Sequence, residues 1–183
     1  MRASLADLVE NHLTKRIKTK NPASDEVTAK TLFKVLKRRI TADQASPFLD
    51  ALVEDAALYR AMNEPEYGKW AKEEKEIARA LSALVTLRVV QQTPCVLSVL
   101  REYRVTKKLK KKHVEEAIVA IEKFHFLFTA VTSQRSSGGV SEMYAALGRR
   151  LFEAKDTNDA VKVIRPSGEN FPANSFAGGL RKG

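Results

Sequence analysis

Seven basic side chains lie in the short stretch from Arg101 to Lys112, and Glu102 is the one acidic residue among them. Positive charge at this density can neutralise the phosphates of a nucleic acid, which releases counterions and adds affinity without any reading of sequence. The same residues could instead form a solvated linker before the next helix, where lysines would oppose the helix dipole. Both interpretations stay open for this stretch, which we call the basic segment. Its predicted phosphate contacts are Arg101, Arg104, Lys107, Lys108, Lys110, Lys111 and Lys112.

A second candidate for anion binding is a short turn further along the chain. Two hydroxyl groups, a guanidinium group and the backbone N–H groups of a helix start could together hold a phosphate. An ordinary capped turn uses the same residue types, so this alternative also stays open. The residues of this predicted turn are Arg135, Ser136, Ser137, Gly138 and Gly139.

The other residues capable of chemistry predict no catalytic centre and no metal site. His12, His113 and His125 are the only histidines, and Cys95 is the only cysteine, so the sequence has no His-Glu-x-x-His pattern and no pair of cysteines. It also has no Gly-x-x-x-x-Gly-Lys loop and no nucleophile elbow. Adjacent acidic residues diverge by about 100° on a helix, which favours solvated faces over acid/base pairs. We therefore expect no catalytic residue, no cofactor and no enzymatic activity from this chain alone.

A predicted helix follows the basic segment directly and carries an apolar stripe about a third of its circumference wide. His125 lies inside this stripe, which favours a core histidine with one hydrogen-bond partner over a functional histidine. Val119 and Phe126 project to nearly the opposite side, which predicts a helix packed centrally in a bundle. The stripe consists of Val114, Ala117, Ile118, Ile121, Phe124, His125 and Phe128.

Helical spacing of apolar residues recurs along nearly the whole chain, without a convincing alternating strand pattern. Thr41 and Gln44 are spaced as in a capping box, and Ser46-Pro47 is typical of a helix start. The fold class predicted is all-α, an irregular bundle of about six or seven helices. We expect one helical domain over residues 1–154 and a tail over 155–183 that is loop-like, flexible or awaiting a partner. The predicted helices cover about 5–17, 27–40, 46–59, 70–90, 93–100, 112–128 and 141–151.

The composition suits one globular domain of ordinary type, with 183 residues that are 44% hydrophobic and 30% charged. A chain of this length buries enough surface to need neither a metal nor disulfides. It shows no signal peptide and no long uncharged apolar run, so we expect a cytoplasmic protein without a membrane partner. The net charge of +10 is unevenly spread: residues 1–40 carry ten basic and four acidic side chains, whereas 41–80 carry five and nine.

The segment IEKFHFLFTAVTSQRSSGGVSEMYAALGRRL, residues 121–151, resembles the late helical region of GmrSD-type restriction proteins, the domain-of-unknown-function 262 family. Two earlier segments, FLDALVEDAALYRAM at 48–62 and TPCVLSVL at 93–100, occur in the expected order. The resemblance covers roughly residues 1–154. It implies a phage-defence setting, in which related proteins pair a ParB/sulfiredoxin-like, nucleotide-using domain with helices and often with an HNH nuclease domain.

Neither the Asp-Gly-Gln-Gln-Arg type motif of that first domain nor an HNH pattern occurs in this sequence. The resemblance therefore implies a non-catalytic helical module whose protein partner is a nuclease or a nucleotide-using domain of the same system. With the basic segment, it leads to the hypothesis of a module that contacts the DNA backbone or docks to a nuclease. No interleaving of aromatic and basic residues supports base stacking, so we expect contacts to the phosphate backbone. The alternative is a protein-interaction scaffold without nucleic-acid contact.

Overall fold

The computed structural model describes residues 9, 12, 30–132 and 138–165, and the structural statements that follow concern these residues. Every regular element within these ranges is helical, which confirms the predicted all-α fold. No helix there is long and apolar enough to cross a membrane. Most of the predicted helix at 5–17 lies outside the described residues, as do residues 166–183 of the predicted tail.

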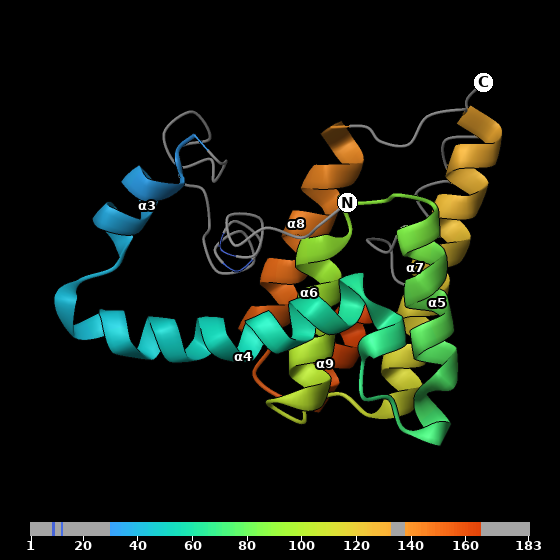
Figure 1. The fold of residues 1–183 in the computed structure, drawn as a ribbon, viewed down its shortest axis with the longest axis horizontal. Coiled ribbons are helices and arrows are strands. Elements are labelled where there is room, and N and C mark those ends of the chain that lie inside the picture. Colours follow the sequence, from blue (N-terminus) through green and yellow to red (C-terminus); the bar gives the residue numbers. More distant parts are fainter. Residues whose placement is uncertain (1–8, 10–11, 13–29, 133–137, 166–183) are drawn as a thin grey trace.

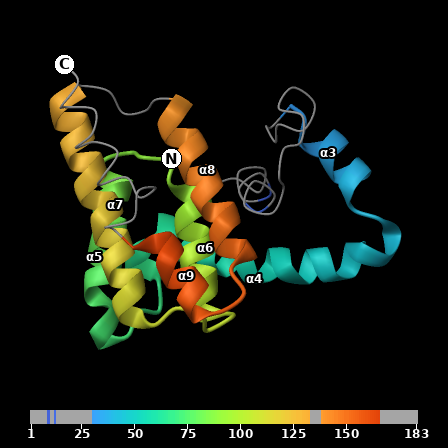
Figure 2. The same cartoon turned by 180° about the vertical axis from the view of Figure 1, so that it is seen from behind.

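Helices α5 to α9 and the second half of α4 form a bundle, shown from two sides in Figures 1 and 2. Within it, α6 packs most extensively against α8, and α5 packs against α7. Three short 3-10 helices, η1 to η3, precede or follow the longer helices. The bounds are α3 Leu32–Arg39, η1 Ala42–Gln44, α4 Ala45–Asn63, η2 Pro65–Tyr67, η3 Lys72–Glu74, α5 Lys75–Thr86, α6 Thr93–Arg104, α7 Lys111–Thr132, α8 Gly138–Glu153 and α9 Thr157–Ile164.

The first half of α4 extends away from the bundle and carries α3 at its far end (Figure 1). Burial along α4 explains this arrangement, because Asp55, Leu58, Tyr59 and Met62 are buried and all lie in its second half. Upstream, Val53 is 71% exposed. The buried side chains of α4 therefore all lie in its second half, while Leu52, one turn earlier, is partly buried and also packs against the core.

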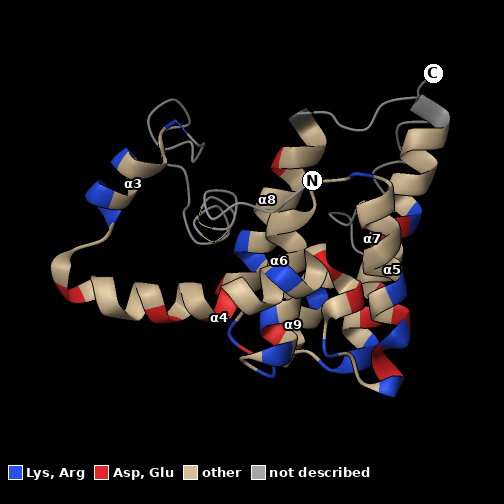
Figure 3. Cartoon of the chain, in the orientation of Figure 1, with Lys and Arg blue, Asp and Glu red and all other residues tan. Residues whose placement is uncertain are grey.

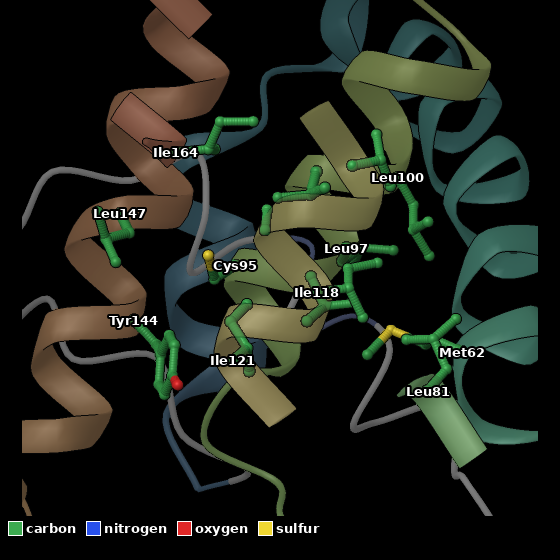
Figure 4. Close-up of a cluster of buried hydrophobic side chains, with 14 of the residues drawn as sticks. Met62, Leu81, Cys95, Leu97, Leu100, Ile118, Ile121, Tyr144, Leu147 and Ile164 are labelled. Atoms are coloured by element: carbon green, nitrogen blue, oxygen red, sulfur yellow. The ribbon is translucent and has the colours of Figure 1, made fainter. Parts of the chain in front are cut away.

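Helix α6 occupies the centre of the bundle, since all ten residues from Thr93 to Glu102 are buried. The sequence predicted this position for α7 instead. The apolar stripe of α7 is buried as expected. On the opposite side, Val119 is partly buried and packs against the core, whereas Phe126 is 62% exposed, so α7 is enclosed less completely than α6. Figure 4 shows side chains from several helices meeting in this core, including Leu97 of α6, Ile118 of α7, Tyr144 of α8 and Ile164 of α9.

A glycine allows the central contact between α6 and α8. A Cβ atom on Gly148 would lie 2.9 Å from the carbonyl oxygen of Pro94, which is closer than side-chain carbons normally approach backbone. The Ser98 hydroxyl donates to the Gly148 carbonyl at 3.1 Å across the same contact. The two helices therefore pack backbone to backbone, which a larger residue at position 148 would prevent.

The structure differs from the sequence-based expectation in the helix expected over 70–90 and in the predicted tail. The helix expected over 70–90 begins as η3, where the Glu74 side chain accepts from the backbone N–H of Ala71 at 2.8 Å. Helix α5 ends before Arg88, whose φ is 54°.

Helix α9 lies within the predicted tail. Its cap is Asp156, which accepts from the backbone N–H of Asp159, and its apolar face is buried in the core. The helical part therefore extends ten residues beyond 154, to Ile164.

Candidate nucleic-acid interface

The basic segment contains the last turn of α6, the connection to α7 and the first residues of α7. Its connection is held in place, because Leu109 is 2% exposed and its backbone N–H donates to the Glu102 carbonyl at 3.0 Å. Lys107 adopts a left-handed backbone conformation, with φ of 60°, which lysine rarely does. The segment is therefore a defined turn with both ends fixed by helices.

Arg101 is an internal residue that joins α6 to α4. Its guanidinium group donates to Asp55 at 2.8 Å and to Glu54 at 2.8 Å, and Asp55 also contacts the ring of the buried His12. Burial acts to lower the pKa of Arg101, but the hydrogen bonds and charges of the two carboxylates outweigh it, so the pKa is raised. The charge of Arg101 is thus matched inside the fold.

Arg104 and Lys108 also make internal contacts. Arg104 donates to Glu74 at 2.7 Å, and its guanidinium lies over the Trp70 ring at 5.0 Å. The Lys108 ammonium donates to the Ala154 carbonyl at 2.7 Å and pairs with Glu102 at 3.2 Å. These two side chains therefore connect the basic segment to η3, to the end of α8 and to α6.

The remaining four lysines are more accessible. Lys111 pairs with Glu115 at 2.7 Å, whereas the Lys112 and Glu116 groups are 3.9 Å apart and the Lys112 side chain is 80% exposed. Lys107 and Lys110 are exposed, and no acidic group within the described part of the chain lies within salt-bridge distance of either. Of the seven predicted contacts, Lys107, Lys110 and Lys112 are the best placed to meet a phosphate.

The predicted anion-binding turn cannot be built from the described residues. Arg135, Ser136 and Ser137 lie outside them, and Gly138 and Gly139 are the first two residues of α8. Among the described residues outside its own helix turn, no atom would lie within 4 Å of a Cβ atom on Gly139. Phosphate binding at this turn therefore stays a prediction.

Beside the basic segment lies a pocket of about 710 Å³ that sequence reasoning missed. Its apolar wall comes from α4 and α6, and no acidic residue in the described part of the chain lines it. Contrary to the expectation from the sequence, aromatic and basic side chains interleave here, and the run Tyr-Gly-Lys-Trp at 67–70 was the available signal. The aromatic and basic residues that line the pocket are Arg60, Tyr67, Lys69, Trp70, Arg104 and Lys107.

The Trp70 ring has a fixed position in this pocket. Its indole N–H donates to the Pro65 carbonyl at 2.9 Å, and a Cβ atom on Gly68 would lie 2.2 Å from the indole nitrogen. Only glycine at position 68 lets the ring fold this closely over the chain. We call the whole hollow the Trp70 pocket.

Helix α3 is a second basic surface, at the far end of α4. Figure 3 shows basic bands on this helix and no acidic ones. Lys34 and Lys37 are exposed there, and the sequence has no acidic residue between Lys30 and Ala42. By contrast, basic and acidic bands alternate around α5 and the start of α7 in the same view.

The buried titratable groups of the core have structural roles. His125 is buried, and its Nε2 shares a hydrogen bond with the Tyr144 hydroxyl at 3.0 Å, which confirms the predicted core histidine. Burial lowers the pKa of His125 to about 4 and raises the pKa of Cys95 to about 12. Among the described residues, no group of three histidine, cysteine or acidic side chains is placed to hold a metal ion.

Comparisons of the chain with protein-family models, with curated proteins and with solved structures found no match.

Proposed function

We propose that this chain is a non-catalytic helical module that contacts the phosphate backbone of DNA, in a restriction system of the kind that the GmrSD resemblance implies. The observation that carries the proposal is the exposure of Lys107, Lys110 and Lys112 at one end of the bundle, two of them without an acidic partner among the described residues. Such lysines can neutralise DNA phosphates, and the release of the cations condensed on the DNA then drives backbone binding.

The internal ion pairs support this proposal indirectly. Arg101 and Arg104 hold α4, α6 and η3 together, so the lysines are presented on a fixed turn between two helices. A fixed set of charges loses less conformational entropy on binding than the same charges on a flexible linker. The proposed contact therefore narrows from seven residues to the three exposed lysines.

The test is binding of a plain DNA duplex by fluorescence anisotropy across a salt series. The variant Lys107→Asn/Lys110→Gln removes the two unpaired charges, with asparagine chosen because it tolerates the left-handed backbone at 107. The matched control is Arg88→Asn/Lys123→Gln, which removes two exposed cations elsewhere on the surface. Like Lys107, Arg88 has a left-handed backbone conformation, whereas Lys123 lies in an ordinary helix. We expect the first variant alone to reduce the slope of log K against log salt by about 2. Equal slopes for both variants would refute the proposed contact.

A second candidate function, docking to a protein partner, is favoured by a separate surface. Phe126 is 62% exposed and Leu127 is 50% exposed on α7. Phe126 also lines a shallow hollow of about 400 Å³, together with Ala83, Thr86 and Leu87 of α5 and the turn after it. Exposed apolar side chains of this size are typical of interaction sites. If this function is correct, the chain associates with an enzymatic partner, and added salt does not weaken that association. The variant Phe126→Ser should weaken it.

A further inference from the structure

The Trp70 pocket has an unbalanced positive charge. Among the described residues, four cations and no acidic residue line it, and two of the positive charges are matched nearby, Arg104 by Glu74 and Arg60 by Glu64. The other two, Lys69 and Lys107, are exposed and have no acidic partner within the described ranges. A ligand that enters this pocket therefore gains most from carrying a negative charge close to these two lysines.

The rest of the pocket fits a flat organic body. Its wall is apolar, built from alanine and leucine side chains of α4 and α6, and the Tyr67 side chain at its edge is 72% exposed. One inorganic phosphate would leave most of about 710 Å³ unfilled, whereas volumes of this order are typical of sites for small organic ligands. An exposed tyrosine ring beside cations is the arrangement on which nucleic-acid bases stack.

The pocket is also formed in advance of any ligand. The indole N–H of Trp70 is held by the Pro65 carbonyl, and Arg104 is held between Glu74 and the indole ring. The absence of a side chain at Gly68 is required for this close packing. A ligand would therefore lose little binding energy to ordering these side chains.

We infer that the Trp70 pocket binds a nucleotide, with its phosphates on Lys69 and Lys107 and its base against the Tyr67 ring. This goes beyond the proposed function, because it assigns a small-molecule ligand to a hollow that duplex DNA does not need to enter. The apolar wall of α4 and α6 would contact the sugar. No chemical step on the nucleotide is implied.

The chain offers a direct readout, because Trp70 is its only tryptophan and lines the pocket. We would titrate ATP and AMP into the protein and follow indole fluorescence, with adenosine and inorganic pyrophosphate as the two half-ligands. The nucleotide base absorbs ultraviolet light and can lower the measured fluorescence without binding. Isothermal calorimetry on the same solutions would distinguish true binding from this optical effect. We expect saturable binding of both nucleotides, and at least roughly tenfold weaker binding of each half-ligand, since each loses one of the two contacts.

Two variants and one control complete the experiment. Lys69→Gln/Lys107→Asn and, separately, Tyr67→Ala should each weaken nucleotide binding roughly tenfold or more, while Arg88→Asn/Lys123→Gln should bind as the unaltered protein does. All replaced side chains are exposed, so unfolding midpoints near that of the unaltered protein are expected. Three results would overturn the inference: no saturable binding at millimolar nucleotide, pyrophosphate binding as tight as ATP, or unchanged affinity in the lysine variant. Duplex binding is measured separately, so loss of one function leaves the other testable.

Discussion

Acidification should destabilise the fold through His125. Burial lowers the pKa of this residue to about 4 in the folded protein, whereas an unfolded histidine titrates at about 6.5. The unfolded chain therefore binds a proton at higher pH than the folded one does. The contribution of neutral His125 to stability is complete above pH of about 6.5 and is lost as the pH falls toward 4.

The two pKa values set the size of the effect. The full loss is about 3 kcal/mol, because each unit of difference corresponds to about 1.4 kcal/mol. Between about pH 7 and pH 5, the linkage relation gives a loss of about 2 kcal/mol. The measurement is urea unfolding followed by circular dichroism at several pH values in this range.

A double variant isolates this contribution. His125→Leu/Tyr144→Phe removes both partners of the buried hydrogen bond at once, so that neither polar group is left unsatisfied. His113→Gln, on the same helix but only half-buried, is the control and should keep the pH dependence of the unaltered protein. If the double variant lost stability between pH 7 and 5 as steeply as the unaltered protein, the assignment of this effect to His125 would be refuted.

Three further predictions concern packing and buried charge. Gly148→Ala should destabilise the fold by about 1–3 kcal/mol, because its Cβ atom would press on the Pro94 carbonyl. The control Gly139→Ala should not destabilise the fold, and thermal unfolding of the two variants measures the difference. Arg101→Gln should cost about 3 kcal/mol, or roughly 6–12 °C in Tm, because it removes the guanidinium group that pairs with the buried Asp55. A change below about 0.5 kcal/mol would mean that the pair contributes nothing. Cys95 should resist thiol-specific labelling in the native protein and react on unfolding, since burial raises its pKa to about 12; rapid native labelling would contradict its burial.

Local patterns of residues predicted much of the fold. The stripe on α7 and the role of His125 follow from spacing along one helix, and both are confirmed. The cap at Thr41 is also local, since its backbone N–H donates to the Gln44 side chain. Such features depend on residues three or four apart, which the sequence displays directly.

Features that depend on distant residues were missed. The central position of α6 arises from its packing against α4, α7 and α8, and its own apolar run is short. Arg101 resembles its basic neighbours in the sequence, and only the packing of α4 brings Asp55 beside it. The Trp70 pocket likewise combines α4, the residues after it and the end of α6.

Binding of duplex DNA across a salt series decides whether the exposed lysines of the basic segment contact phosphates. We expect affinity to fall steeply with salt for the unaltered protein and for Arg88→Asn/Lys123→Gln. For Lys107→Asn/Lys110→Gln, the slope of log K against log salt should be shallower by about 2. Absence of duplex binding at low salt, or a slope that the lysine variant leaves unchanged, would contradict a DNA contact at the basic segment.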